Sequence, residues 1–153
     1  MSFTDDMTVK QARDLLRGLA QNGGHDCPVC TQRAQVYTFG FNGAMARGLI
    51  RMYRTGGQDW VNVPDLGLPG GHMLKARFWS LIEKPPELVR EDGSSRVGVW
   101  RLTEDGVGFV SNRVPIRSHA RIYNNRCLGF RGDPVMIVQV LGKRFDYHEL
   151  MNG

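Results

Sequence analysis

The sequence has few cysteines and no long apolar run. Only three of its 153 residues are cysteines, and an odd number in a chain without a secretory signal does not indicate a disulfide framework. No apolar stretch approaches the roughly 20 residues that a membrane-spanning helix needs. The first residues also lack the basic and then apolar layout of a secretory signal. We therefore expect a cytoplasmic protein without a membrane segment, whose cysteines bind metal or remain free thiols.

The sequence also lacks the motifs of common catalytic and nucleotide-binding sites. The glycines between Gly67 and Gly71 match neither the phosphate-binding loop nor the dinucleotide-binding fingerprint. The four histidines are scattered, and none pairs with an acidic residue at the spacing of a helical metal site. We therefore expect no enzymatic activity.

Acidic residues are scarce in the C-terminal segment. Residues 1–41 carry four basic and four acidic side chains, residues 42–112 carry nine and eight, and residues 113–153 carry seven and three. Most of the net charge of +5 at pH 7 therefore lies in the tail. A basic protein favours acidic partners such as nucleic acid, but a near-neutral middle segment weakens the case for phosphate contacts there.

Three segments are predicted from periodicity and turn residues, and together they indicate the α+β class. Residues 1–41 hold an amphipathic helix, Thr8 to Asn22, and a Cys-x-x-Cys segment. Residues 113–153 hold a basic hairpin around Asn124-Asn125 and then short helices. We expect one of these helices to begin at Asp133-Pro134 and a last one to be capped by Asp146.

The middle segment, residues 42–112, is predicted to form the core. Its elements are a helix at 43–54, a short strand at 60–63, a helix at 71–84, a hairpin at 88–102 and a helix at 103–112. The helix at 71–84 places Leu74, Phe78, Leu81 and Ile82 on one apolar face at helical spacing. Ala76 and Trp79 point away from this face, so we expect Trp79 to be exposed. Trp100 and Leu102 share one side of their strand and are expected in the core.

The middle segment resembles the winged helix-turn-helix superfamily, in particular its bacterial and phage members. The residues that match are Ser80-Leu81-Ile82 and, after the predicted hairpin, Trp100-Arg101-Leu102-Thr103-Glu104-Asp105-Gly106 and Phe109. Many members have glycine where this chain has Ser80, and tyrosine where it has Trp100. The resemblance covers about residues 42–112 and implies a winged helix-turn-helix core. It also implies that the helix at 71–84 enters a major groove and that the hairpin tip contacts the minor groove or the backbone.

Two functions follow from the resemblance and from the charge pattern. The first is a small phage or prophage regulator of transcription that binds double-stranded DNA. The expected nucleic-acid contacts are Lys75, Arg77, Arg90, Ser94, Ser95, Arg96, Arg121 and Arg126, the last two from the basic tail. The alternative is a protein-binding module, such as a phage protein that inhibits a host protein, because an exposed Trp79 suits a protein interface.

The cysteine pair predicts a structural zinc site. Cys27-Pro-Val-Cys30 has the spacing of a knuckle whose two thiolates hold one side of a tetrahedral zinc ion. Cys127 is the expected third ligand, and the fourth is taken as His25, with His119 and His148 as alternatives. A free dithiol and two buried cysteines are the competing interpretations. The oligomeric state stays open, with a homodimer as one alternative.

Overall fold

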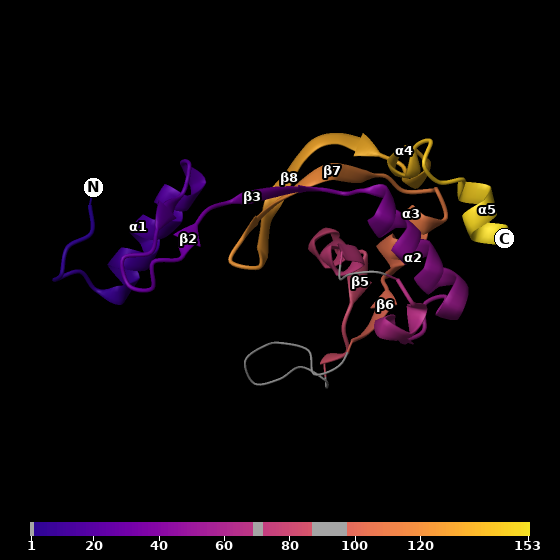
Figure 1. Cartoon of the computed structure of the whole chain (residues 1–153), viewed down its shortest axis with the longest axis horizontal. Helices are drawn as coiled ribbons and strands as arrows, with labels where there is room; N and C mark the ends of the chain where they lie inside the picture. Colours follow the sequence, from indigo (N-terminus) through magenta and orange to yellow (C-terminus); the bar gives the residue numbers. More distant parts are fainter. Residues whose placement is uncertain (1, 69–71, 87–97) are drawn as a thin grey trace. The chain divides into compact units, whose positions relative to one another are not determined.

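The computed structural model describes residues 2–68, 72–86 and 98–153 of the chain (Figure 1). It has two compact units, one of Met1–Phe39 with Ala120–Phe130 and one of Gly40–His119 with Arg131–Gly153. Helices and small antiparallel sheets make up both units, so the predicted α+β class is confirmed. Within the described residues, every helix is too short or too polar to cross a bilayer.

The first unit begins with helix α1, Val9–Gln21, close to its predicted bounds. Thr8 caps the helix, because its side chain accepts from the Gln11 N–H while Gln11 accepts from the Thr8 N–H. Gly23 and Gly24 follow with φ of 102° and 91°, a region that favours glycine, and they end the helix as predicted. Strands β1, His25–Asp26, and β2, Arg33–Ala34, then pair antiparallel around the cysteine pair.

A three-stranded sheet has the order β3-β7-β8, from strands β3, Tyr37–Gly40, β7, Ile116–Tyr123, and β8, Arg126–Val135. Asn124 and Asn125 connect β7 to β8 with φ of 51° and 61°. Two consecutive residues of positive φ form the tight turn that suits a twisted hairpin, so the predicted hairpin is confirmed.

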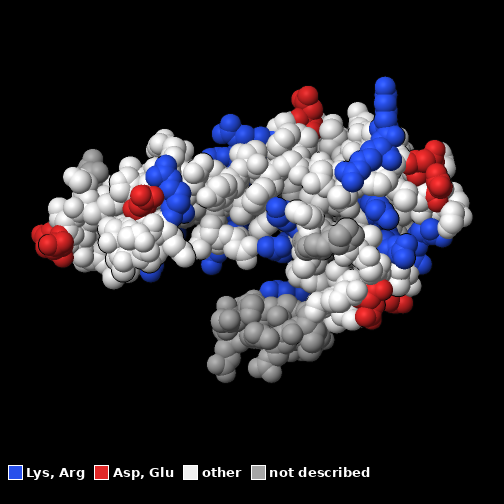
Figure 2. Space-filling model, viewed as in Figure 1, with Lys and Arg blue, Asp and Glu red and all other residues white. Residues whose placement is uncertain are grey.

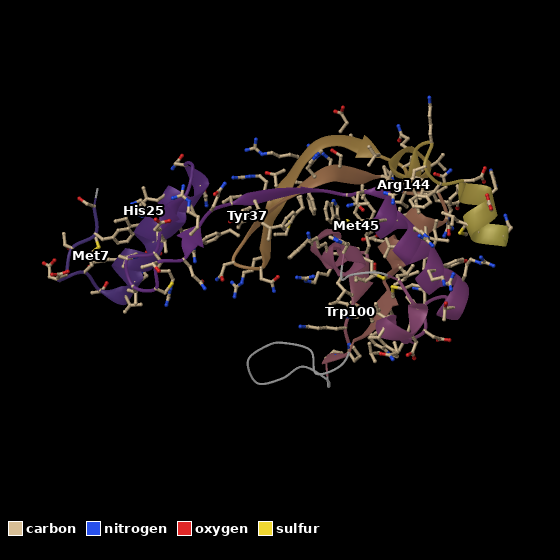
Figure 3. The ribbon with its side chains drawn as sticks, in the orientation of Figure 1. Met7, His25, Tyr37, Met45, Trp100 and Arg144 are labelled. Carbon is tan, nitrogen blue, oxygen red and sulfur yellow. The ribbon has the colours of Figure 1, made fainter. Side chains whose placement is uncertain are left out.

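The second unit is built on helix α2, Gly43–Gly56. The Asn42 side chain caps it by accepting from the Met45 N–H at 2.9 Å. The helix buries Met45, Leu49 and Met52 on one face, as its spacing predicts. Figure 3 labels Met45 on this helix and Trp100 on the sheet beside it.

A small antiparallel sheet in this unit has the order β4-β6-β5. Its strands are β4, Val61–Asn62, β5, Ile82–Glu83, and β6, Val99–Leu102. On the central strand, Trp100 and Leu102 are buried, which confirms their expected place in the core. A single 3₁₀ turn, η1, Val63–Leu66, follows β4.

The predicted α-helix at 71–84 is wrong in type and length. The structure has a 3₁₀-helix, η2, His72–Trp79, and strand β5 takes up the last residues of the predicted range. A 3₁₀-helix has three residues per turn, so residues three apart face the same way. The buried residues are accordingly Met73, Ala76 and Trp79. The expectation that Ala76 and Trp79 point away from the core is therefore also wrong.

Close packing on α2 explains why tertiary contacts override the helical periodicity. A Cβ atom added at Gly48 of α2 would lie 2.8 Å from the Cβ of Met73, so η2 approaches the α2 backbone at this glycine. At the other end of η2, the Trp79 indole N–H donates to the Arg117 carbonyl at 2.7 Å. The Trp79 ring also meets Phe41 edge-on at 5.1 Å.

The remaining helices are short and belong to the second unit. They are α3, Glu104–Val110, α4, Ile137–Leu141, and α5, Tyr147–Asn152. Thr103 caps α3, and Asp146 caps α5, both as predicted. The predicted helix start at Asp133-Pro134 is wrong, because both residues belong to β8. A proline is compatible with β8, because β8 lies at the edge of its sheet and needs no second row of hydrogen bonds.

Three of the residues that carry the superfamily resemblance, Ser80, Leu81 and Thr103, meet in the second unit. Ser80 has φ of 58°, a left-handed conformation that glycine adopts at lower cost. The Thr103 hydroxyl donates to the Ser80 carbonyl at 2.6 Å, and the Thr103 N–H donates to the Leu81 carbonyl at 3.0 Å. The start of α3 is thus fastened to the chain between η2 and β5.

The left-handed backbone at Ser80 leads to a stability prediction. We expect Ser80→Gly to raise the free energy of unfolding by about 0.5 to 1 kcal/mol, since glycine removes the steric cost of positive φ but loses more entropy on folding. Urea unfolding measures the change, with Ser111→Gly, at a residue of φ −79°, as a control that loses stability. A loss of stability in Ser80→Gly contradicts the prediction.

Candidate nucleic-acid interface

The two nucleic-acid contacts predicted on η2, Lys75 and Arg77, are both partly buried in the structure. The Arg77 guanidinium donates to the Leu74 carbonyl at 2.8 Å and lies 4.3 Å from the centre of the Phe78 ring. Burial lowers the pKa of Arg77 from its ordinary value. Lys75 is half-buried on the same 3₁₀-helix. Neither side chain is presented to a groove in the way that a recognition helix presents its contacts.

The predicted wing contacts Arg90, Ser94, Ser95 and Arg96 lie outside the described residues. The strands on either side of them are described, and they hold an ion pair between Arg101 and Glu83 with an N–O distance of 2.6 Å. Arg101 also lies over the Trp60 ring, 4.2 Å from its centre. This arginine is engaged within the protein.

The tail arginines Arg121 and Arg126 lie beside the tight turn of the β7–β8 hairpin. Because the turn has two residues, it sets Tyr123 opposite Arg126 and, two residues on, Arg121 opposite Leu128. These four side chains share one face of the hairpin, and Phe130 follows on the same face of β8. Residues Ala120 and Ile122 on the other face are buried.

The exposed face of the hairpin combines positive charge with apolar surface. Arg126 is exposed and Arg121 is half-buried. Leu128 and Phe130 are 41% and 42% exposed to solvent. From Ile116 to Gly132 the sequence contains four arginines and no acidic residue. Figure 2 shows Lys and Arg side chains over these strands. From Ile116 to Gly132 the hairpin therefore presents its arginines without an acidic residue, and Asp133 follows near the end of β8.

Trp79 does not form an exposed interface residue. It is 7% exposed, and its ring contacts and indole hydrogen bond lie inside the second unit. The expectation of an exposed tryptophan is therefore wrong, and the protein-binding alternative loses the observation on which it rested.

The cysteine pair lies in a turn that β1 and β2 close. The Cys27 N–H donates to the Gln32 carbonyl at 2.8 Å, and the Thr31 N–H donates back to the Cys27 carbonyl at 3.0 Å. Thr31 has φ of 64°. Hydrogen bonds from the backbone N–H groups of Cys30 and Val29, and then from the Cys30 thiol, hold the pKa of the Cys27 thiol below its ordinary value. Cys27 is therefore deprotonated more easily than an ordinary cysteine.

The two other predicted zinc ligands do not join the pair. The Cys127 thiol donates to the Gly129 carbonyl of its own strand at 3.4 Å, and His25 Nδ1 lies 2.8 Å from the Asp26 carbonyl. Among the described residues, which include every cysteine and histidine of the chain, no three metal-ligating side chains lie close enough together to hold an ion. Zinc binding by the pair stays a prediction.

The second unit has a basic groove that was not predicted. It has a volume of about 560 Å³ between α2 and the C-terminal residues. Its charged lining consists of four arginines, Arg47, Arg51, Arg54 and Arg144, and two acidic residues, Asp146 and Glu149. Arg54 donates to the carbonyls of Leu150 and Gly153, and Arg47 and Arg144 both lie against the Phe145 ring. These contacts hold the C-terminal residues on α2. The three arginines of α2 are spaced so that they share one face of the helix, and this spacing could have predicted the groove from the sequence.

In a comparison with known proteins, no protein family, curated protein or solved structure matches this chain.

Proposed function

We propose that this protein is a non-enzymatic DNA-binding protein that contacts double-stranded DNA with its β7–β8 hairpin. The observation that carries the proposal is the part of the hairpin next to the turn, residues 116–132, which has no acidic residue and holds Arg121 and Arg126 on one face. Arginines at this density neutralise backbone phosphates and release counterions from the duplex. The buried opposite face anchors the hairpin to the protein.

The shape of the hairpin favours duplex DNA over a single strand. A major groove admits a two-stranded β-ribbon, and a ribbon that ends in a tight turn can reach the groove floor. Asn124 and Asn125 stand at that turn, and asparagine amides pair with the adenine edge. Arg126 beside the turn is placed to reach a phosphate at the groove wall.

The proposal keeps a winged-helix scaffold of the regulator type for the second unit. Helix α2, strand β4, the 3₁₀ segments η1 and η2, and strands β5 and β6 follow one another along the chain, with β6 between β4 and β5. The resemblance implies an α-helix where η2 lies and a hairpin at 88–102, most of which lies outside the described residues. The proposal differs in where it places the contact. Because η2 is a 3₁₀-helix with Arg77 turned inward, we assign the main contact to the hairpin instead of to residues 72–79.

The salt dependence of DNA binding tests this proposal. We expect the full chain to bind a duplex of mixed sequence, with an affinity that falls steeply between about 50 and 200 mM salt. Arg121→Ala with Arg126→Ala is expected to reduce the slope of log K against log salt by about 2, about one for each lost phosphate contact. Fluorescence anisotropy with a labelled duplex measures both quantities.

The matched control is Arg13→Ala with Arg17→Ala, which removes the same charge from the exposed face of α1. We expect its slope to equal that of the unmodified chain. An equal loss in both double variants would mean that only net charge matters, and the hairpin assignment would be wrong. A chain that prefers single strands, or that retains no duplex at low salt, would contradict the proposed duplex partner.

A further inference from the structure

The cysteine turn has the local geometry of half a metal site. The knuckle, defined as residues 27–32, is closed at its base by the antiparallel pairs His25 with Ala34 and Asp26 with Arg33. Cys27 and Cys30 are free thiols on this turn, and Cys30 is exposed. Two cysteines at this spacing on a tight turn are the usual way for a chain to supply two of the four ligands of zinc.

The knuckle points into solvent. Val29, between the two cysteines, is 90% exposed. The carboxylate nearest in sequence, Asp26, forms an ion pair with Arg33, at an N–O distance of 3.4 Å. Cys30 and the tip of the turn are therefore exposed, Cys27 is half-buried, and the charged residues at the base of the turn are paired with each other.

Within residues 2–68, 72–86 and 98–153, no further ligand joins the two cysteines. Structural zinc takes four ligands in a tetrahedron, and nitrogen and sulfur donors dominate such sites. Cys127 and His25 belong to the same unit as the knuckle, but neither lies with the pair to form a group of three ligands in the described chain. Two further ligands must come from outside the knuckle.

We propose that two copies of this chain bind one Zn²⁺ between their knuckles, each copy supplying Cys27 and Cys30. A two-fold arrangement brings identical turns together and gives the four thiolates of a closed structural site. It also covers the exposed Val29 of each copy with that of the other. The site is incomplete without the second chain.

The chemistry of assembly is a simple exchange of protons for metal. Four thiols lose four protons, and their sulfur atoms bind one Zn²⁺ without any change in oxidation state. The bound cluster carries two negative charges, one for each chain.

Zinc content and mass together test the proposal. The full chain, purified under reducing conditions without chelator, is expected to hold one zinc ion per two chains and to run as a dimer in light scattering. Removal of zinc by a chelator is expected to give a monomer. Substitution by Co²⁺ is expected to give the absorption bands of a tetrahedral site with four thiolates.

Three variants make the result specific. Cys27→Ser with Cys30→Ser is expected to lose both zinc and dimer, and Cys127→Ser is expected to keep both. Circular dichroism of each variant shows whether the fold is retained. One zinc ion per chain in a monomer, loss of zinc in Cys127→Ser, or a zinc-free reduced chain would each overturn the proposal. The proposal does not rest on DNA binding, so the two can fail separately.

Discussion

Trp79→Ala is expected to lower the free energy of unfolding by about 3 to 5 kcal/mol, the range for removal of a large buried aromatic side chain. The ring is almost fully buried, and it packs edge-on against Phe41 at 5.1 Å. Phe41 in turn packs against Phe109, with 5.3 Å between the ring centres. Loss of the indole therefore opens a cavity next to two aromatic rings that depend on each other for packing. Urea or guanidinium unfolding of the full chain measures the change.

Trp79→Phe separates the packing from the hydrogen bond. Phenylalanine keeps most of the apolar contact but cannot donate to the Arg117 carbonyl, which then lacks its indole partner. We expect this variant to cost about 1 to 2 kcal/mol, the usual penalty for a polar group left without a partner. If Trp79→Ala changed stability by less than about 1 kcal/mol, the side chain would not be a core residue. The protein-binding function would then regain its best candidate residue.

Gly106→Ala is expected to cost about 3 kcal/mol or more, because the added methyl group meets backbone instead of a movable side chain. A Cβ at this position would lie 2.1 Å from the Leu81 carbonyl oxygen and 3.0 Å from its carbon. The same carbonyl accepts from the Thr103 N–H, so it cannot move away without breaking that bond. Thermal and denaturant unfolding should both show the loss.

Gly108→Ala in the same helix is the matched control. There an added Cβ would meet the side chain of Val114, with 2.7 Å to its Cγ2 atom. Val114 is 40% exposed and can turn toward solvent, and alanine favours the helix more than glycine by about 1 kcal/mol. We expect a change of less than about 1 kcal/mol. Equal losses in the two variants would show that α3 does not depend on its contact with Leu81.

N-cap residues and the glycines that follow helix ends were sufficient to predict most helices from the sequence. Thr8, Asn42, Thr103 and Asp146 each accept from a backbone N–H at the start of a helix, as their residue types predict. These signals are local, since a cap and its helix lie within a few residues of each other. The Asn124-Asn125 turn was predictable for the same reason.

The 3₁₀-helix η2 could not be predicted, because its form depends on residues distant in sequence. Residues 74, 78, 81 and 82 have a helical period, yet Gly48 admits Met73, and the Arg117 carbonyl accepts from Trp79. Neither partner is visible in the local pattern. The error carried into the function, because it misplaced Trp79 and the predicted contacts of the same segment.

The functional residues also divide into those that local sequence signals predict and those that depend on contacts distant in sequence. The tail arginines and the cysteine pair were predictable because charge counts and Cys-x-x-Cys spacing are properties of the chain itself. The arginine groove on α2 was missed because the helix was interpreted for its apolar face only, although residues 47, 51 and 54 follow one another at helical spacing. The remaining zinc ligands could not be predicted, since sequence distance does not determine which side chains meet.

The position of β8 at the edge of its sheet has a consequence for self-association. An edge strand offers a row of unpaired N–H and C=O groups to any other exposed strand, which is a common route to aggregation. On β8 the charges of Arg126 and Arg131 repel a second copy, Pro134 removes one donor, and Gly129 and Gly132 with φ of 149° and 83° interrupt the pleat. Arg126, which we assign to a phosphate contact, thus also helps to keep β8 from pairing with another chain while no nucleic acid is bound.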